Sequence, residues 1–209
     1  MTGVQTGALP IYLADFLSDR LMELPDKSSV FFIGRYGLDI DFIKDSLGFA
    51  CKYDNAGGKT VVVFARRKDL KIEFLTAHHS KGLQADYVFI LNNRRSYKGF
   101  PSKMQDAPIL SLFLDNCDSY QYAEERRLFY VALTRAKVKV ILLTLAGKES
   151  EFVGELRSVY ASQMKLEAFT CPRCGGRIIK KDGKYGEFYG CENFRTKGCE
   201  FTRNIRGRG

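Results

Sequence analysis

The chain has 209 residues, of which 45% are hydrophobic and 27% charged. This balance excludes an intrinsically disordered protein, which would need few apolar residues and a large charge excess. The length allows at most two domains of ordinary size, and no apolar stretch approaches the ~20 residues of a membrane-crossing helix, so we expect no membrane partner. The net charge of +9 favours a polyanionic partner, and the lack of a secretory-signal pattern favours a cytoplasmic protein.

We interpret residues 1–11 as a segment that does not belong to the natural protein. Residues 1–11 resemble the translation of a common sequencing-library adapter, with Gly7 where the adapter would encode cysteine. We therefore expect an artefact of cloning or assembly, in which case the natural protein continues further upstream. The alternative is a genuine leader segment.

Residues 12–150 alternate between helical and strand-like patterns of apolar residues. Helical spacing predicts helices, and short runs of β-branched and aromatic residues predict strands. In chain order we expect a helix over 12–24, a strand over 30–33, a helix over 38–47, strands over 60–65, 70–76 and 87–91, an irregular loop with one short helical piece over 92–118, a helix over 123–137 and a strand over 138–145. This alternation predicts an α/β domain with a mostly parallel sheet.

The C-terminal end of the chain differs from the rest in composition. Residues 151–168 predict a connecting helix. A cysteine-rich module follows over residues 169–205, and residues 206–209 form a basic tail.

Four cysteines lie in this module as two close pairs, Cys171-x2-Cys174 and Cys191-x7-Cys199. Two such pairs at this separation are typical of two knuckles that bind one tetrahedral Zn²⁺ through four thiolates. A module this small buries too little apolar surface to fold unaided, so the metal would supply much of its stability. The alternatives are two disulfides or unrelated thiols.

Basic and aromatic residues lie between the two cysteine pairs, among them Lys184, Tyr185, Phe188 and Tyr189. This mixture predicts binding of single-stranded nucleic acid, because cations follow the phosphates and rings stack on the bases. The alternative, which extends to Phe194, is that about half of these rings form the core of the module.

The module resembles the four-cysteine zinc finger at the C-terminal end of bacterial type I DNA topoisomerases. The resemblance is carried by Cys171-Pro-x-Cys174-Gly-Gly, Gly186-x-Phe-x-Gly190-Cys191 and Cys199-x-Phe-Thr. The last spacer is longer than in that family, which makes Cys199 the ligand that departs from the pattern. The resemblance implies DNA binding and does not by itself imply topoisomerase catalysis.

One arginine lies in line with the apolar face of the helix predicted over 123–137. Leu128, Val131 and Ala132 mark that face, and Arg135 follows seven residues after Leu128, on the same face. Because arginine keeps its charge in proteins, it needs an anionic partner. That partner is either Glu124 or another carboxylate, in a structural ion pair, or the phosphate of a ligand.

Polar residues follow the strand predicted over 70–76. His78, Ser80 and Lys81 come directly after this strand, at the edge where ligands bind in open α/β sheets. Hydroxyls, a lysine and backbone amides near Gly82 suit phosphates. For His78 the alternative is a structural histidine.

Together these two segments resemble the fifth and sixth conserved motifs of superfamily I helicases of the UvrD/Rep type, and among them the helicase IV branch. The fifth is carried by Thr76-x-His78-x-Ser80-Lys81-Gly82 and Asp86-Tyr-Val, and the sixth by Glu124-Glu-Arg-Arg-Leu-x-Tyr130-Val-Ala-Leu-Thr134-Arg135-Ala. The resemblance implies that residues 12–150 are the C-terminal part of the second RecA-like motor domain, followed by a small zinc-ribbon-like module.

The helicase resemblance also implies roles for individual residues. Arg135 would be the arginine finger that stabilises charge on the γ-phosphate of ATP, with Gly82 and Gln84 also at the nucleotide. Gln84 stands where many relatives have a glutamate, which weakens its assignment. The residues implied to line the path of single-stranded DNA are Thr76, His78, Ser80 and Lys81.

Two helicase motifs are missing from this sequence. It has no Gly-x-x-x-x-Gly-Lys-[Ser/Thr] phosphate loop and no apolar strand ending in paired acidic residues for Mg²⁺. We therefore expect ATP and Mg²⁺ to bind only together with a missing N-terminal half of the same polypeptide, and this chain alone to be inactive. The alternatives are a non-enzymatic DNA-binding or adaptor protein with a degenerate motor half, or the accessory tail of a type I topoisomerase.

Overall fold

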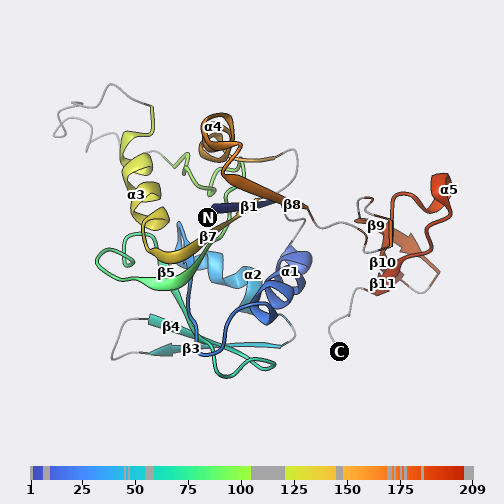
Figure 1. The fold of residues 1–209 in the computed structure, drawn as a ribbon, viewed down its shortest axis with the longest axis horizontal. Coiled ribbons are helices and arrows are strands. Elements are labelled where there is room, and N and C mark those ends of the chain that lie inside the picture. Colours follow the sequence, from blue (N-terminus) through green and yellow to red (C-terminus); the bar gives the residue numbers. More distant parts are fainter. Residues whose placement is uncertain are drawn as a thin grey trace. The chain divides into compact units, whose positions relative to one another are not determined.

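The chain forms two compact units, Met1–Glu167 and Ala168–Gly209, in a computed structural model (Figure 1). The described residues are 2–6, 10–44, 46, 48–54, 59–104, 121–144, 148–168, 171, 173–174, 176, 178–184 and 186–204. Within these ranges no helix is both long and apolar enough to cross a membrane.

The larger unit is an α/β domain. Its elements are β1 Thr2–Thr6, α1 Pro10–Met22, β2 Ser29–Gly34, the 3-10 helix η1 Gly37–Ile40, α2 Asp41–Lys44, β3 Phe49–Asp54, β4 Lys59–Phe64, β5 Lys71–Thr76, β6 Ala85–Ile90, α3 Ala123–Leu133, β7 Ala136–Thr144, α4 Glu151–Tyr160 and β8 Met164–Ala168.

One eight-stranded sheet organises this unit, with the strand order β3-β4-β5-β2-β6-β7-β1-β8. Strands β5, β2, β6, β7 and β1 pair in parallel, whereas β3, β4 and β5 pair antiparallel. The prediction of a mostly parallel sheet is therefore confirmed. The central strands β2 and β6 are apolar almost throughout because both faces of the sheet are covered.

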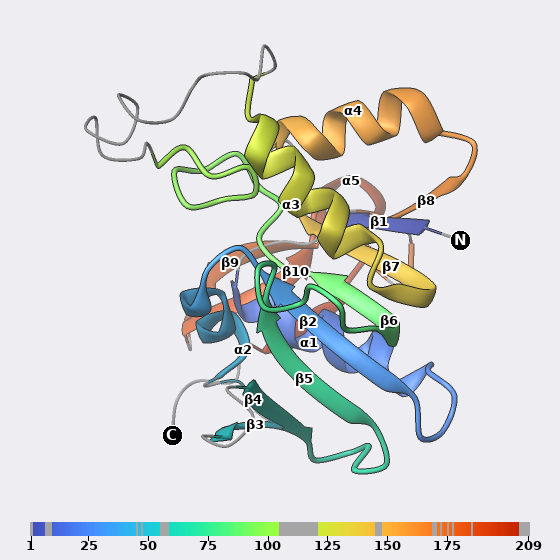
Figure 2. The same ribbon diagram turned by 90° about the vertical axis from the view of Figure 1, so that its left-hand side faces the viewer.

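Helices cover the two faces of the sheet, with α1 on one side and α3 and α4 on the other (Figure 2). On the α3 and α4 side, Phe129 and Ala132 of α3 and Phe152 and Val153 of α4 are buried in one core with apolar side chains of the sheet. The rings of Phe129 and Phe152 lie 5.2 Å apart between centroids. This core holds α3 in place, and with it the turn that carries Arg135.

Several predicted elements differ from the structure. The predicted helix over 38–47 is only η1 and the short α2, with residues 45 and 47 outside the described residues. Strand β3 was not predicted. The predicted helix over 151–168 ends at Tyr160, and β8 follows it. The predicted irregular loop falls partly on residues 105–120, which are not among the described residues.

The segment that we interpret as adapter-derived contains strand β1. Residues Thr2–Thr6 pair in parallel with β7, with Gly3 opposite Ile141. Pairing within the sheet does not test where the segment comes from, so its artefactual origin stays a prediction.

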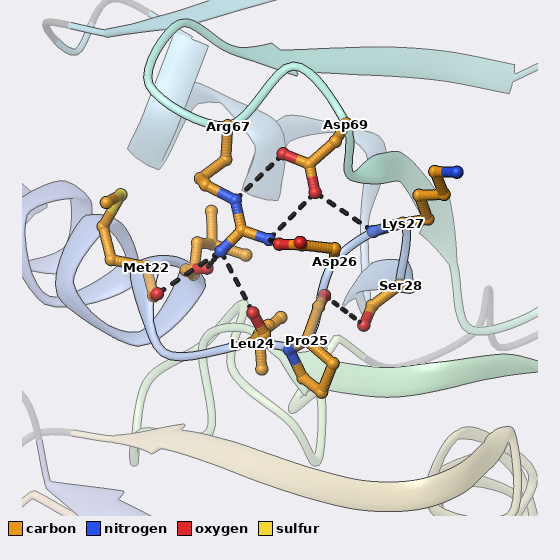
Figure 3. A network of polar contacts seen from close by, with 9 residues as sticks. Met22, Leu24, Pro25, Asp26, Lys27, Ser28, Arg67 and Asp69 are labelled. Carbon is orange, nitrogen blue, oxygen red and sulfur yellow. Dashed lines mark hydrogen bonds and ion pairs between the residues drawn. The ribbon is translucent and has the colours of Figure 1, made fainter.

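Arg67 joins the turn after β4 to the end of α1 (Figure 3). Its Nη1 donates to the carbonyls of Leu21, Met22 and Leu24 at 3.4, 3.3 and 3.0 Å. Its Nε and Nη2 donate to both carboxylate oxygens of Asp69 at 2.9 Å. These bonds supply donors to carbonyls at and just after the last turn of α1, where intrahelical donors run out, and the cation suits the negative end of the helix dipole.

We expect Arg67→Ala to lower the melting temperature of the chain by about 3 °C or more. The substitution removes the donor for three backbone carbonyls. It also removes the hydrogen bond from Arg67 that contributes most to lowering the pKa of the Asp69 carboxyl, with the N–H of Lys27 contributing less. Thermal unfolding followed by circular dichroism measures the change. Lys68→Ala in the same turn, where the side chain is exposed, is the control and should change the melting temperature little.

The smaller unit, which we call the finger, is a three-stranded antiparallel sheet. Its elements are β9 Ile178–Gly183, β10 Gly186–Cys191, the short helix α5 Phe194–Lys197 and β11 Thr202–Asn204, and the strand order is β11-β10-β9. Cysteines flank this sheet on the N-terminal side of β9, at the end of β10 and before β11.

Candidate functional site

The segment 77–84 connects β5 to β6, which run parallel on either side of β2. It therefore leads from the C-terminal end of β5 to the N-terminal end of β6. The amide of Ser80 donates to the carbonyl of Thr76 at 3.0 Å, and the amide of Leu83 donates to the carbonyl of Ser80 at 3.1 Å. These bonds fold the segment into consecutive turns instead of an open loop.

The four residues predicted to line the DNA path differ in exposure. His78 and Lys81 are exposed, and Thr76 is half-buried. Ser80 is completely buried, and its hydroxyl donates to the carbonyl of Ala77 at 2.7 Å. In this structure Ser80 therefore stabilises the turn and does not present its hydroxyl to solvent.

His79 is a residue that the sequence analysis did not select. Its Nδ1 lies 3.2 Å from Oγ1 of Thr76, and its side chain is exposed. The contact ties the Thr76 hydroxyl to a second imidazole beside His78. In the sequence, the only signal for a role of His79 is its position next to His78.

Arg135 lies in the turn between α3 and β7, and its guanidinium contacts backbone and hydroxyl oxygens. Nε donates to the carbonyl of Val131 at 2.8 Å, Nη1 to the carbonyl of Leu83 at 3.2 Å, and Nη2 to Oγ1 of Thr134 at 3.0 Å. These three bonds leave part of its set of five N–H donors for another partner. None of the described carboxylates forms an ion pair with Arg135.

The two acidic residues at the start of α3 are directed elsewhere. Glu124 is exposed, and Glu125 forms an ion pair of 2.6 Å with Arg35, just after β2. Glu125 also accepts a hydrogen bond from the amide of Ser102 at 2.9 Å. Burial lowers the pKa of Arg35, but the hydrogen bond and charge of Glu125 outweigh it and raise that pKa overall. Glu125 therefore anchors α3 to the sheet and does not neutralise Arg135.

The predicted nucleotide-binding residues meet around Arg135. Besides the bond to Leu83, the carbonyl of Arg135 accepts the amide of Ala85 at 3.1 Å. Gly82 and Gln84 flank Leu83. Gln84 is exposed, and Gly82 has φ +79° with open space where a side chain would stand. Segment 77–84 thus begins at the predicted DNA residues and ends at the predicted nucleotide residues.

The four cysteines of the finger form one cluster. All four Sγ atoms lie within 4.8 Å of one another, with Cys171 and Cys199 3.5 Å apart and Cys174 and Cys191 3.3 Å apart. A tetrahedron of Zn–S bonds of about 2.3 Å has sulfurs about 3.8 Å apart, so this donor set fits Zn²⁺. Cys199 belongs to the cluster despite its longer spacer.

The thiols of this cluster ionise very differently. The N–H of Gly176 and the side-chain amide of Asn193 lower the pKa of Cys174 to about 6. Burial raises the pKa of Cys191 to about 12. Cys174 is therefore a thiolate near neutral pH, whereas zinc must displace the proton of Cys191, so binding strengthens as the pH rises.

Residues predicted to bind DNA lie on different faces of the finger. Lys184 is exposed and Phe188 is half-buried, whereas Tyr185 lies outside the described residues. Tyr189 is 1% exposed, and burial raises the pKa of its phenol. Its ring is therefore part of the core of the finger, as the alternative reading of these aromatics allowed, and is not available for stacking in this structure.

Two family descriptions match the two units. Residues 64–146 match the UvrD-like helicase C-terminal domain, and residues 168–207 match the topoisomerase DNA binding C4 zinc finger. The chain therefore combines a segment similar to the helicase C-terminal domain with a segment similar to the topoisomerase zinc finger, and both predicted resemblances are confirmed.

The similar proteins include both helicases and topoisomerases. The chain is 41% identical over 90 residues to DNA helicase IV of Escherichia coli K12, covering 43% of this chain and 13% of that protein. It is 32% identical over 129 residues to DNA helicase II of the same organism, covering 54% and 16%. The chain is also 44% identical over 43 residues to DNA topoisomerase 1 of Methanocaldococcus jannaschii, covering 21% and 5%. The chain thus spans a small part of each relative.

Proposed function

We propose that this chain is the C-terminal part of an ATP-dependent DNA helicase, in which ATP hydrolysis drives translocation along single-stranded DNA and unwinding. The observation that carries the proposal is the guanidinium of Arg135, which is half-buried yet has no carboxylate partner among the described residues. A phosphate-loop domain outside this sequence would hold ATP and Mg²⁺ opposite it.

The surroundings of Arg135 suit an arginine finger. The guanidinium of Arg135 is half-buried, and Glu125, the acidic residue of α3 that is not exposed, pairs with Arg35 instead. The charge of Arg135 is therefore available to an anionic ligand. Bonds to Val131 and Leu83 hold the side chain in one orientation without cancelling its charge. A positioned cation of this kind stabilises the charge that develops on the γ-phosphate in the transition state.

Segment 77–84 connects the proposed DNA site to the proposed nucleotide site. Thr76 and His78 lie at its start, where we propose the single-stranded DNA path, and Lys81 adds a cation. Gly82 and Gln84 lie at its end, where we propose contact with the nucleotide. Because the segment is a chain of hydrogen-bonded turns with Ser80 buried inside it, a shift at one end would move the other. Such a rigid connection suits a motor that couples hydrolysis to movement.

The finger adds a second DNA contact in this proposal. Its family match and its exposed Lys184 support binding of single-stranded DNA by cations and rings. We propose that it holds Zn²⁺ through Cys171, Cys174, Cys191 and Cys199.

The first test uses this chain as it is. The purified, zinc-loaded 209-residue chain should bind single-stranded DNA but show no ATP hydrolysis above background with Mg²⁺ and DNA, because it lacks a phosphate loop. A coupled phosphate-release assay measures this, with an intact superfamily I helicase as positive control. DNA-stimulated ATPase that disappears in Arg135→Ala would contradict the need for a second domain. A purely non-enzymatic adaptor predicts instead that the upstream reading frame encodes no phosphate loop.

A further inference from the structure

Asn193 lies in the seven-residue spacer between the two cysteines of the second pair. The spacer follows Cys191 at the end of β10 and contains the short helix α5. Asn193 directly precedes α5, at the position where an asparagine side chain usually accepts a bond from the first backbone N–H groups of a helix. The side chain of Asn193 forms no such capping bond, so its position is fixed by other contacts.

The side chain of Asn193 contacts the sulfur cluster instead. Its Nδ2 donates to Sγ of Cys174 at 3.5 Å, and its Oδ1 accepts the hydroxyl of Thr196 at 3.5 Å. A thiolate sulfur can only accept a hydrogen bond, and the hydroxyl supplies the donor that Oδ1 needs. The two bonds therefore agree on one orientation of the side-chain amide.

The backbone of Asn193 reaches two further cysteines. Its N–H donates to Sγ of Cys191 at 3.4 Å. Its carbonyl accepts the N–H of Lys197 at 2.9 Å and the N–H of Cys199 at 3.3 Å. The bond from Lys197 closes the turn of α5, and the bond from Cys199 ties the end of the spacer to its beginning. Asn193 thus contacts three cysteines that are far apart in the sequence or separated by the longer spacer.

Gly176 leaves the space that the side chain of Asn193 occupies. A methyl group on this glycine would collide with Nδ2 of Asn193 and would lie 2.9 Å from its Cγ. The carbonyl of Gly176 accepts the N–H of Cys171 at 2.7 Å, so the glycine belongs to the knuckle formed by the first cysteine pair. Asn193 therefore bridges the two knuckles across a position that has no side chain.

A site of four thiolates needs hydrogen-bond donors around it. Zn²⁺ with four thiolates keeps a net charge of about −2, and N–H groups that donate to the ligand atoms spread this charge and orient the ligands. Asn193 directs two N–H groups at the sulfurs, one to Cys174 and one to Cys191. Each cysteine pair therefore receives one donor from the same residue.

We propose that Asn193 is the positioning residue of the metal site: its two N–H groups hold the sulfurs of Cys174 and Cys191, and its carbonyl brings Cys199 to them. This inference rests on the proposed zinc binding by the finger and adds the residue that arranges the ligands. It also explains how the second knuckle closes around the same cluster in spite of its longer spacer, because α5 takes up the additional residues and Asn193 joins both ends.

The test measures metal affinity by titrating the full chain with Zn²⁺ against a competing chelator. Asn193→Ala should bind Zn²⁺ about ten- to a hundredfold more weakly than wild type, the usual effect of removing a hydrogen-bond partner of metal ligands. Asn193→Asp should bind more weakly still, because its carboxylate has no N–H to donate and adds a negative charge beside the sulfurs. With Co²⁺ as the probe, the sulfur-to-metal charge-transfer absorption should move to longer wavelength in both variants.

A role as a simple helix cap predicts a different order of the same variants. Aspartate caps helices as well as asparagine does, whereas alanine does not, so a cap requires Asn193→Asp to keep the wild-type affinity. Thr202→Ala changes an exposed residue of β11 and is the control, which should bind Zn²⁺ like wild type. Circular dichroism at saturating Zn²⁺ shows whether each variant folds once the metal is bound.

Coupling between Asn193 and Gly176 provides an independent test. Gly176→Ala should weaken Zn²⁺ binding in the wild-type chain and much less in Asn193→Ala, where the methyl group no longer meets the side-chain amide. Additive losses in the double variant, or wild-type affinity in Asn193→Asp, would overturn the positioning role. A wild-type chain that binds no Zn²⁺ would instead contradict the proposed function of the finger.

Discussion

Arg135→Ala in the proposed full-length helicase is expected to lower kcat for DNA-stimulated ATP hydrolysis by about a thousandfold or more, the usual contribution of an arginine finger. The affinity for single-stranded DNA should change little, because the bonds of Arg135 run to Val131, Leu83 and Thr134 and none runs to the predicted DNA residues. Steady-state ATPase assays and DNA titrations on the same preparations measure both quantities.

Two further variants separate chemistry from folding. Arg135→Lys should remain strongly impaired, since lysine keeps the charge but not the planar fork of donors. Arg66→Ala removes an exposed arginine in the turn between β4 and β5, which β2 and β6 separate from β7 in the sheet, and should keep full turnover. Parallel losses of ATPase activity and DNA affinity in Arg135→Ala would indicate a structural role for the guanidinium.

Removal of zinc is expected to unfold the finger while the larger unit keeps its structure. The buried thiols Cys171, Cys191 and Cys199 would otherwise crowd together without a metal, and structural zinc supplies about 10–16 kcal/mol to modules of this kind. Strong chelation, or Cys191→Ser, should abolish bound zinc and expose the chain after residue 168 to proteases. Metal analysis and limited proteolysis measure these effects.

A matched cysteine variant controls this experiment. Cys51→Ser in β3 lies in the other unit and should leave one zinc per chain. Cys199→Ser should lose the metal as fully as Cys191→Ser, because both sulfurs belong to the same cluster. Retention of stoichiometric zinc in Cys199→Ser would show that the longer spacer removes it from the ligand set.

Local patterns predicted the elements that are buried on both sides. Strand β2 and the C-terminal parts of β6 and β7 are short buried apolar runs, which predict strands from the sequence alone. Strand β3 was missed because its residues after Cys51 are polar or exposed, as at Lys52 and Asp54, and pairing with β4 fixes it instead. An edge strand of this kind has little signal of its own in the sequence.

The candidate site, like the fold, was only partly predictable from the sequence. Motif spacing located the cysteine cluster and the two helicase segments, because these depend on residues close together in the sequence. The exposure of single side chains depends on contacts made across the fold. Ser80 turns inward to the carbonyl of Ala77. Tyr189 is buried on one face of the sheet of the finger, whereas its neighbour Phe188 lies half-buried on the opposite face. Neither outcome can be read from residue type alone.

Binding of a transition-state analogue tests the role of Arg135 most directly. The full-length helicase and its Arg135→Ala variant would be titrated with ADP alone and with ADP–aluminium fluoride, which mimics the transferring phosphoryl group. If Arg135 acts on the γ-phosphate, the variant should bind the analogue about a hundredfold or more weakly than wild type, while its affinity for ADP stays close to wild type. Equal affinities of wild type and variant for the analogue would contradict the account.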